Sequence, residues 1–129
     1  MSQRDLFEFF MGGGFERGEG KSGAAWHPPT DVYEVEEGAT IILEIAGMSG
    51  GEFNLMVRNR TIVITGRRQD LNEKQAYRQM EIHYGEFRSE VELPWPVDVN
   101  SIETSYSDGF FKVVIRRSKP KRIPVRSLD

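Results

Sequence analysis

The segment from Phe15 to Ser22 (FERGEGKS) comes close to the phosphate-binding pattern GxxxxGK[ST], in which backbone amides and a lysine hold phosphate groups. It fails at the first position, where Phe15 replaces the glycine. A phosphate loop also needs a strand before it and a helix after it, whereas Gly23, Pro28 and Pro29 follow here. We therefore interpret this segment as a flexible linker.

Other residue types that could perform catalysis are present, but not in catalytic patterns. His27 and His83 lie far apart and belong to no HxxxH or HExxH arrangement that would gather a metal ion. Serines such as Ser49 and Ser89 have no obvious general base to activate them. The carboxylates at solvent-facing positions of the predicted strands include Glu44, Glu90 and Glu92. The sequence thus predicts no enzyme, no catalytic or metal-binding residue and no cofactor.

Length and composition fit one domain with extra segments at its ends. The 129 residues are 38% hydrophobic and 29% charged, and none is cysteine, which excludes disulfides and fits a reducing compartment. Asp5 and Glu8 interrupt the first apolar stretch, so the N-terminus does not resemble a signal peptide. No apolar run approaches the roughly 20 residues of a membrane span. We expect a cytoplasmic protein that does not bind membranes.

The charge is unevenly distributed along the chain. Residues 112–129 carry a net charge of +6, while the whole chain carries −3, so the remainder carries −9. A basic tail could contact the phosphates of a nucleic acid, but no aromatic residue stands among these basic residues to stack on bases. A solvated tail explains the charges better, and we expect no nucleic-acid binding.

Between residues 28 and 117, apolar residues alternate with polar ones, and Gly, Pro, Asn or Asp stands at the breaks. This pattern is typical of short, half-buried strands, and Asn59-Arg60 and Asp108-Gly109 indicate tight hairpin turns. We predict an all-β, immunoglobulin-like antiparallel sandwich over 28–117, with a flexible N-terminal arm at 1–27 and a C-terminal extension at 118–129. The expected strands are 30–35, 40–46, 52–58, 61–65, 85–93, 102–106 and 110–115.

Residues 67–84 (RRQDLNEKQAYRQMEIHY) are too many for an ordinary hairpin loop. Loops of this length in compact domains are usually functional or reach a partner. The apolar residues Tyr77, Met80 and Ile82 could pair as a strand with another subunit.

Two apolar segments lie outside the predicted sandwich. One is an aromatic-rich segment of the arm, with Leu6, Phe7, Phe9, Phe10, Met11 and Phe15. Such a short segment cannot form its own core, so it docks on the sheet, assembles with copies of itself, or offers an adaptable surface to partners. The other is Ile123-Pro124-Val125, where the proline keeps the chain extended and both aliphatic side chains point to one side. Extended peptides with alternate apolar anchors are typical of edge-strand addition.

Four motifs, in their order along the chain, resemble the α-crystallin domain and tail of small heat shock proteins. They are Asp31-Val32-Tyr33-Glu34, Tyr84-Gly85-Glu86-Phe87 with Leu93-Pro94, Asp108-Gly109-Phe110-Phe111, and Ile123-Pro124-Val125. The third is similar to the family's A-x-x-x-x-G-V-L signature, with Thr104 in place of Ala and Phe110-Phe111 in place of Val-Leu. The family often carries arginine where this chain has Ser89.

The resemblance implies an ATP-independent holdase, a chaperone that binds partly unfolded clients and prevents their aggregation. It implies a homodimer in which the exchanged strand of the long loop pairs with the partner's first strand, through Ala76, Tyr77, Arg78 and Met80 on one side and Asp31, Val32 and Tyr33 on the other. Dimers would assemble into higher oligomers when the tail anchors Ile123, Pro124 and Val125 enter a groove formed by Phe53, Leu55, Val57, Ile102 and Thr104. The aromatic-rich segment of the arm would be the main client-binding element.

Two other classes stay open on the sequence. A co-chaperone with a similar sandwich, which binds another chaperone, would need neither the tail motif nor the exchange loop. A carbohydrate-binding or jelly-roll enzyme domain would need a concave site with converging His, Asp or Trp residues, whereas Trp26 and Trp95 lie in proline-rich connectors.

Overall fold

The computed structural model describes residues 24–49, 52–72, 74–118 and 123–127. The described chain is all-β, as predicted, with seven strands and one short 3-10 helix, η2 (Val99–Ser101). The strands are β1 (Thr30–Val35), β2 (Gly38–Glu44), β3 (Phe53–Arg58), β4 (Thr61–Arg68), β5 (Gly85–Glu92), β6 (Ile102–Ser107) and β7 (Phe110–Arg116).

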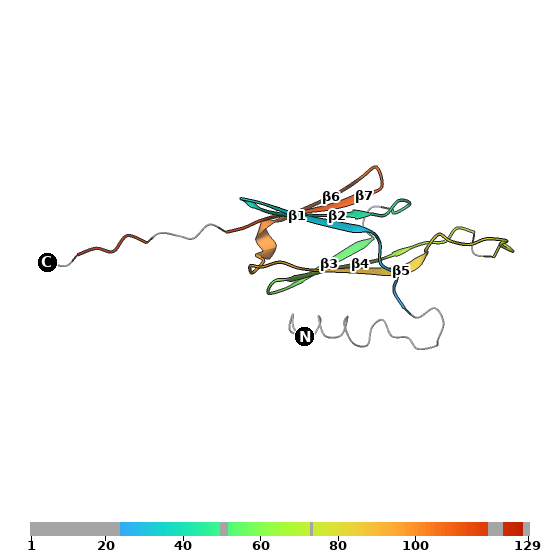
Figure 1. The fold of residues 1–129 in the computed structure, drawn as a ribbon, viewed down its shortest axis with the longest axis horizontal. Coiled ribbons are helices and arrows are strands. Elements are labelled where there is room, and N and C mark those ends of the chain that lie inside the picture. Colours follow the sequence, from blue (N-terminus) through green and yellow to red (C-terminus); the bar gives the residue numbers. More distant parts are fainter. Residues whose placement is uncertain (1–23, 50–51, 73, 119–122, 128–129) are drawn as a thin grey trace.

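The strands form two stacked sheets (Figure 1). One sheet has four strands in the order β1-β2-β7-β6, and the other has three in the order β3-β4-β5. Every strand pair is antiparallel. The prediction of an antiparallel sandwich is therefore confirmed.

Two predicted hairpin turns are confirmed by their backbone conformation. Asn59, between β3 and β4, has a φ of 54°, and Asp108 and Gly109, between β6 and β7, have φ values of 52° and 84°. Asparagine, aspartate and glycine tolerate this left-handed region better than other residues, so these short turns fix the register of both hairpins.

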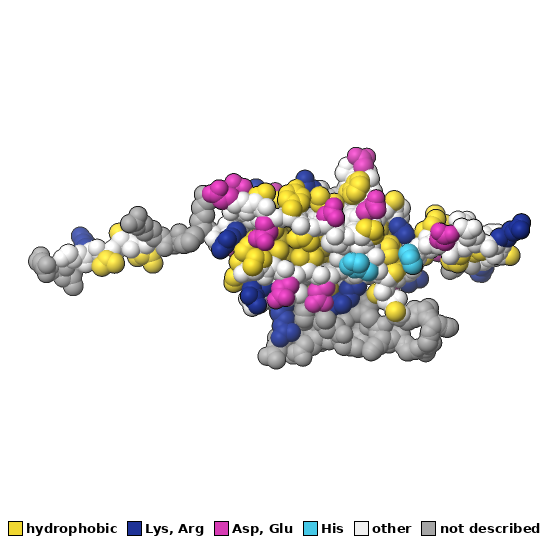
Figure 2. Space-filling view, in the orientation of Figure 1, with side chains coloured by type: hydrophobic (Ala, Val, Ile, Leu, Met, Phe, Trp, Pro, Cys, Tyr) yellow, Lys and Arg dark blue, Asp and Glu magenta, His cyan; other side chains and the backbone are white. Residues whose placement is uncertain are grey.

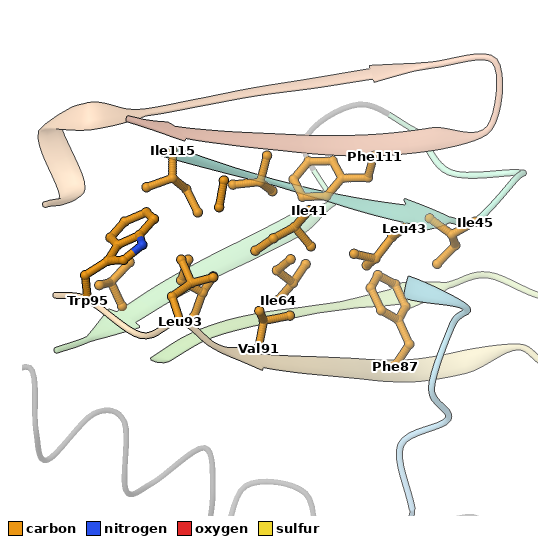
Figure 3. Packing of buried hydrophobic residues seen from close by; sticks show 14 residues of the cluster. Ile41, Leu43, Ile45, Ile64, Phe87, Val91, Leu93, Trp95, Phe111 and Ile115 are labelled. Atoms are coloured by element: carbon orange, nitrogen blue, oxygen red, sulfur yellow. The ribbon is translucent and has the colours of Figure 1, made fainter. Parts of the chain in front are cut away.

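The core lies between the sheets, where alternate residues of each strand meet (Figure 3). Ile41 and Leu43 of β2 and Ile62 and Ile64 of β4 have no exposed surface. Each fully buried side chain of this size contributes about 1.5–3 kcal/mol through the hydrophobic effect. The other core residues are Ala39, Ile45, Val57, Phe87, Val91, Leu93, Trp95, Phe111, Val113 and Ile115.

Strand β4 ends at Arg68, beyond the expected limit at residue 65, and the reason lies in a glycine. Gly66 pairs with Phe53 on one side and Phe87 on the other. A Cβ atom there would lie 2.5 Å from the ring of Phe87 and from the carbonyl oxygen of Glu52. Only glycine leaves space for the Phe87 ring. The strand therefore continues through Gly66, although glycine has a weak preference for strands.

The chain before β1 runs along the outer edge of β5. The Trp26 amide donates to the carbonyl oxygen of Glu86 at 3.0 Å, and the Arg88 amide donates to that of Trp26 at 2.9 Å. Trp26 therefore belongs to the packed sandwich, although it stands just before the predicted limit at residue 28. This short pairing covers part of an otherwise unpaired edge.

Candidate functional site

The predicted groove residues lie on β3 and β6, which are edge strands on the same side of the sandwich. Within the described residues, β3 pairs only with β4, and β6 pairs only with β7. Phe53 and Tyr106 link the two edges, with ring centroids 5.4 Å apart. Two-residue steps from this contact bring Leu55 level with Thr104.

The burial of the five predicted groove residues is graded. Val57 is 5% exposed and belongs to the core, while Phe53, Leu55 and Ile102 are half-buried and Thr104 is exposed. An apolar ledge with a polar rim therefore follows the two edges. Such a ledge suits an extended peptide, because unpaired backbone groups and half-buried side chains are both accessible there.

Aromatic packing closes one end of this ledge. The Phe53 ring stacks on that of Phe111 and also makes an edge contact with Phe87. The Tyr106 hydroxyl donates to the Ile45 carbonyl oxygen at 2.8 Å and accepts from the Met48 amide at 3.3 Å. The two phenylalanines of the signature have separate roles, since Phe111 is buried whereas Phe110 is 46% exposed on the outer face.

The predicted tail anchors are largely exposed to solvent. Ile123 is 76% exposed, Val125 is 94% exposed, and Pro124 is also exposed. The start of the tail is fixed, because the Arg117 amide donates to the Glu37 carbonyl oxygen at 2.7 Å. The Arg117 guanidinium also lies over the Trp95 ring, 5.7 Å from its centroid.

Strand β1 is a further edge strand, and it carries the predicted dimer residues Asp31, Val32 and Tyr33. Among the described residues its only partner strand is β2. Val32 is 44% and Tyr33 47% exposed, and Asp31 is also exposed. An edge with apolar side chains left in water is a ready template for a strand from another chain.

The predicted exchange loop projects from the end of the sandwich beyond β4 and β5 (Figure 1). Residues 69–72 and 74–84 form no strand in the single chain, and Ala76, Tyr77, Arg78 and Met80 are all exposed. Leu71 and Ile82 are also largely exposed, and Leu71 was not among the predicted site residues. A single leucine within a polar segment gives no signal by its spacing.

Local bonds shape the tip of this loop. The Tyr77 hydroxyl donates to the Asn72 carbonyl oxygen at 3.0 Å, and the Gln75 amide donates to the same oxygen at 3.1 Å. Desolvation, with the charges of Asp70 and Tyr84, raises the pKa of the Tyr77 phenol above its usual 10.0. The phenol therefore remains a neutral donor at physiological pH.

Arg68 holds the base of the loop. Its Nε donates to the His83 carbonyl oxygen at 3.0 Å, and its Nη1 donates to that of Ala46 at 3.1 Å. The guanidinium also lies 4.6 Å from the Trp26 ring centroid and 5.5 Å from that of Tyr84. This cluster could not be found from the sequence, because its members come from four separate segments.

Ser89 and Arg88 lie on opposite faces of β5. Ser89 is 1% exposed, and its hydroxyl lies 2.8 Å from that of Thr30. Arg88 points to the outer face, where its Nη2 lies 2.7 Å from a carboxylate oxygen of Glu90. Because successive strand residues alternate between faces, Arg88 cannot replace an arginine at position 89.

The two histidines both lie near the loop base although they stand 56 positions apart in the chain. His83 stacks on Trp26 with centroids 5.4 Å apart, and His27 lies 3.2 Å from the Arg88 carbonyl oxygen. Figure 2 shows both histidines, in cyan, on one face of the sandwich. The described residues contain no group of three His, Cys, Asp or Glu side chains suited to a metal ion.

The predicted solvent-facing carboxylates Glu44, Glu90 and Glu92 are exposed. A hollow of about 700 Å³ at the loop base is lined by Glu52, Arg67, Gln69, Asp70, Tyr84 and Gly85. The sites with clear geometry in the described chain are thus unpaired edges and exposed apolar side chains, which suit protein partners. The predicted client-binding residues of the arm, Leu6 to Phe15, lie outside the described residues.

Comparison of the sequence with known proteins gives consistent matches. The family model described as "Hsp20/alpha crystallin family" matches residues 31–129. The 17.7 kDa class II heat shock protein of Arabidopsis thaliana is 30% identical over 108 residues, which cover 76% of this chain and 69% of the relative. Small heat shock protein C2 of Rickettsia felis is 23% identical over 104 residues, covering 77% of this chain and 68% of the relative.

Solved structures show the same fold. A small heat shock protein from Xylella fastidiosa matches with a TM-score of 0.66 and 24% identity, covering 81% of this chain and all of that one. The hspA protein from Xanthomonas axonopodis matches with a TM-score of 0.67 and 20% identity, covering 73% and 96% of the two chains. No helix among the described residues is long and apolar enough to cross a membrane. The chain belongs to the Hsp20/alpha crystallin family of small heat shock proteins, a family of chaperones rather than enzymes.

Proposed function

We propose that this protein is an ATP-independent holdase, which binds partly unfolded proteins and prevents their aggregation under stress. The observation that carries the proposal is the set of apolar side chains left in water at unpaired edges and projecting segments. Leu71 is 83% exposed and Val125 94%. Soluble proteins seldom leave such groups uncovered unless protein partners cover them. The other large apolar side chains in this set are Val32, Val35, Met80, Ile82 and Ile123.

The dimer forms by exchange of the projecting loop. Residues 76–80 of one subunit add as a strand to the β1 edge of the other, next to Asp31, Val32 and Tyr33. Support comes from the free β1 edge and from the exposed side chains of Ala76, Tyr77, Arg78 and Met80. The backbone bonds of a new strand provide affinity, and the apolar pairs provide register.

Higher assembly uses the tail. Ile123 and Val125 dock along the β3 and β6 edges of another dimer, beside Leu55, Ile102 and Thr104. Burial of two aliphatic side chains supplies about 3–5 kcal/mol before entropic costs. A contact of this strength is reversible, so heating or dilution shifts the population toward smaller species by mass action.

Clients bind mainly to the aromatic-rich segment of the arm, through Leu6, Phe7, Phe9, Phe10, Met11 and Phe15. Phenylalanine and methionine side chains adapt to varied apolar surfaces, which suits a protein that meets many unfolded sequences. The mechanism needs no nucleotide, cofactor or metal. We place the protein in the cytoplasm and assign it neither nucleic-acid nor membrane binding.

The test is the light scattering of a heat-labile client protein, heated with and without this protein in the absence of nucleotide. We expect scattering to fall as the ratio of this protein to client rises, and added ATP to leave the result unchanged. Undiminished scattering, or suppression only with nucleotide, would contradict the proposal. Suppression only with a second chaperone, together with a monomeric mass in solution, would favour the co-chaperone class.

The packing of both tryptophans disfavours the carbohydrate-binding class. Trp95 is 6% exposed and donates from Nε1 to Glu34 at 3.1 Å. The Trp26 ring stacks with His83 and lies 4.6 Å from the Arg68 guanidinium. Both rings therefore already make contacts within the fold, which disfavours stacking on a sugar.

A further inference from the structure

Val63, in the middle of β4, is buried although it lies on the outer face of its sheet, away from the core. Its neighbours Ile62 and Ile64 belong to the core, so alternation places Val63 on the outer face. Val63 is nevertheless 1% exposed, although it is not part of the core cluster. Its cross-strand neighbours on that face are Met56 and Glu90.

Val114 provides a matched comparison in the other sheet. It also occupies the outer face of a central strand, β7, between the cross-strand neighbours Thr40 and Glu103. Val114 remains half-buried. Thr40, at 6% exposure, has the large Tyr33 as its cross-strand neighbour, whereas Val63 lacks an aromatic neighbour on either strand. A valine on the outer face of a central strand, covered only by its two flanking strands, is therefore more exposed to solvent than Val63 is.

The surroundings of Val63 form a defined surface, which we call the outer β4 face: Met56, Arg58, Val63, Thr65 and Arg88. Thr65 is 5% exposed, and the Arg88 side chain only 24%. The register puts Arg88 in the row of Thr65, and Arg58 in the row of Thr61 on the opposite side of Val63. The face thus has Val63 and Met56 at its centre between two guanidinium groups, with Glu90 beside Val63 and 2.7 Å from Arg88.

The residues that precede Trp26 start close to this face. Trp26 is held on the β5 edge beside Arg88, so the preceding residues start at the border of the same sheet. Eight residues lie between Phe15 and Ala24, and four of them are Gly18, Gly20, Ser22 and Gly23. A flexible linker of that length spans about 16 Å, while three strands are only about 10 Å across.

We propose that the aromatic-rich segment of the arm, from Asp5 to Phe15, docks on the outer β4 face of its own subunit. Its phenylalanine rings cover Val63 and contact the thioether of Met56, a favourable partner for aromatic rings. The carboxylates of Asp5 and Glu8 are opposite in charge to the guanidinium groups of Arg58 and Arg88. The docked arm conceals the side chains assigned above to clients, a consequence that rests on the proposed function, whereas the docking itself does not.

Disulfide trapping tests the docking in the full-length chain, because the native sequence has no cysteine. Val63→Cys is combined with Phe7→Cys, Phe10→Cys or Phe15→Cys, and matched controls carry Val114→Cys instead. Disulfides form only when Cα atoms come within about 4.4–6.8 Å, so mild oxidation reports proximity. Far-UV circular dichroism and the thermal midpoint verify that each variant is folded.

We expect at least one Val63→Cys pair to give an intrachain disulfide, seen as a faster monomer on a non-reducing gel, at several times the yield of its control. Glu8→Lys should lower this yield more than Glu19→Lys does. Equal yields with Val63→Cys and Val114→Cys would overturn the proposal, and so would disulfides that link only two chains. Client protection measured on the native chain is independent of this result, so the two proposals can fail separately.

Discussion

Phe53 and Phe111 stack face to face, with ring centroids 4.0 Å apart and an interplanar angle of 6°. Phe53 belongs to the edge strand β3, and Phe111 to β7 in the opposite sheet. The stack therefore ties β3, whose only partner among the described strands is β4, to the core residue Phe111 (Figure 3 labels Phe111). It keeps the β3 edge beside β6, where the proposed tail groove lies.

Phe111→Ala should destabilise the domain by about 3–5 kcal/mol, because it leaves a cavity between Phe53 and the core. Phe110→Ala, one residue earlier on the exposed face, should cost less than about 1 kcal/mol. Urea unfolding followed by tryptophan fluorescence measures both. Similar losses for the two variants would show that the stack is not what anchors β3.

Arg68→Ala should loosen the base of the projecting loop, because it removes the bonds to the Ala46 and His83 carbonyl oxygens and the cation over Trp26. Each hydrogen bond from a charged donor contributes about 1.5–3 kcal/mol when shielded, and less at this partly exposed site. We expect faster amide hydrogen exchange in residues 82–86. Arg67→Ala, at an exposed position, is the control, and equal exchange in both variants would refute the role.

Ile123→Ala with Val125→Ala should reduce the size of the assembly, because both proposed anchors lose most of their apolar surface. Static light scattering at fixed concentration measures the mass, and we expect dimers or small species instead of the native oligomer. Ser118→Ala, between the last strand and the motif, is the control. An unchanged mass in the double variant would exclude tail docking as the assembly contact.

Thr104→Lys should weaken the same proposed contact by changing the groove instead of the tail. The new ammonium group must be desolvated when an aliphatic anchor docks beside it, which opposes binding. Since Thr104 is exposed, the domain itself should stay folded. Ser105→Lys places the same charge on the other face of β6. The groove assignment requires a smaller assembly with Thr104→Lys than with Ser105→Lys.

Met80→Asp should weaken the dimer, since it puts a carboxylate into the strand proposed to pair with the partner's β1. Leu71→Asp makes the same change outside that strand. We expect the concentration at which dimers dissociate to rise at least tenfold for Met80→Asp, which equals about 1.4 kcal/mol. Analytical ultracentrifugation measures this, and a larger effect of Leu71→Asp would place the contact elsewhere in the loop.

The strands, the sandwich and the hairpins at Asn59 and Asp108 could be predicted because they depend on local properties. Two-residue alternation selects strand, and Asn, Asp and Gly accept the left-handed conformation that tight turns need. The limit of β4 could not be predicted in this way. From the sequence, Gly66 predicts the end of a strand. Only its packing against the Phe87 ring explains why the strand continues through a glycine.

The sequence by itself determined the all-β class, the family resemblance and the apolar character of the two ends, because these properties depend only on residue types and their local spacing. The tertiary structure alone decided which residues meet: Arg68 with Trp26, Phe53 with Phe111, and Ser89 inside the sandwich while Arg88 points out. These contacts join positions that are distant in sequence. Their partners depend on strand order and on how the two sheets stack, and local pattern does not specify either.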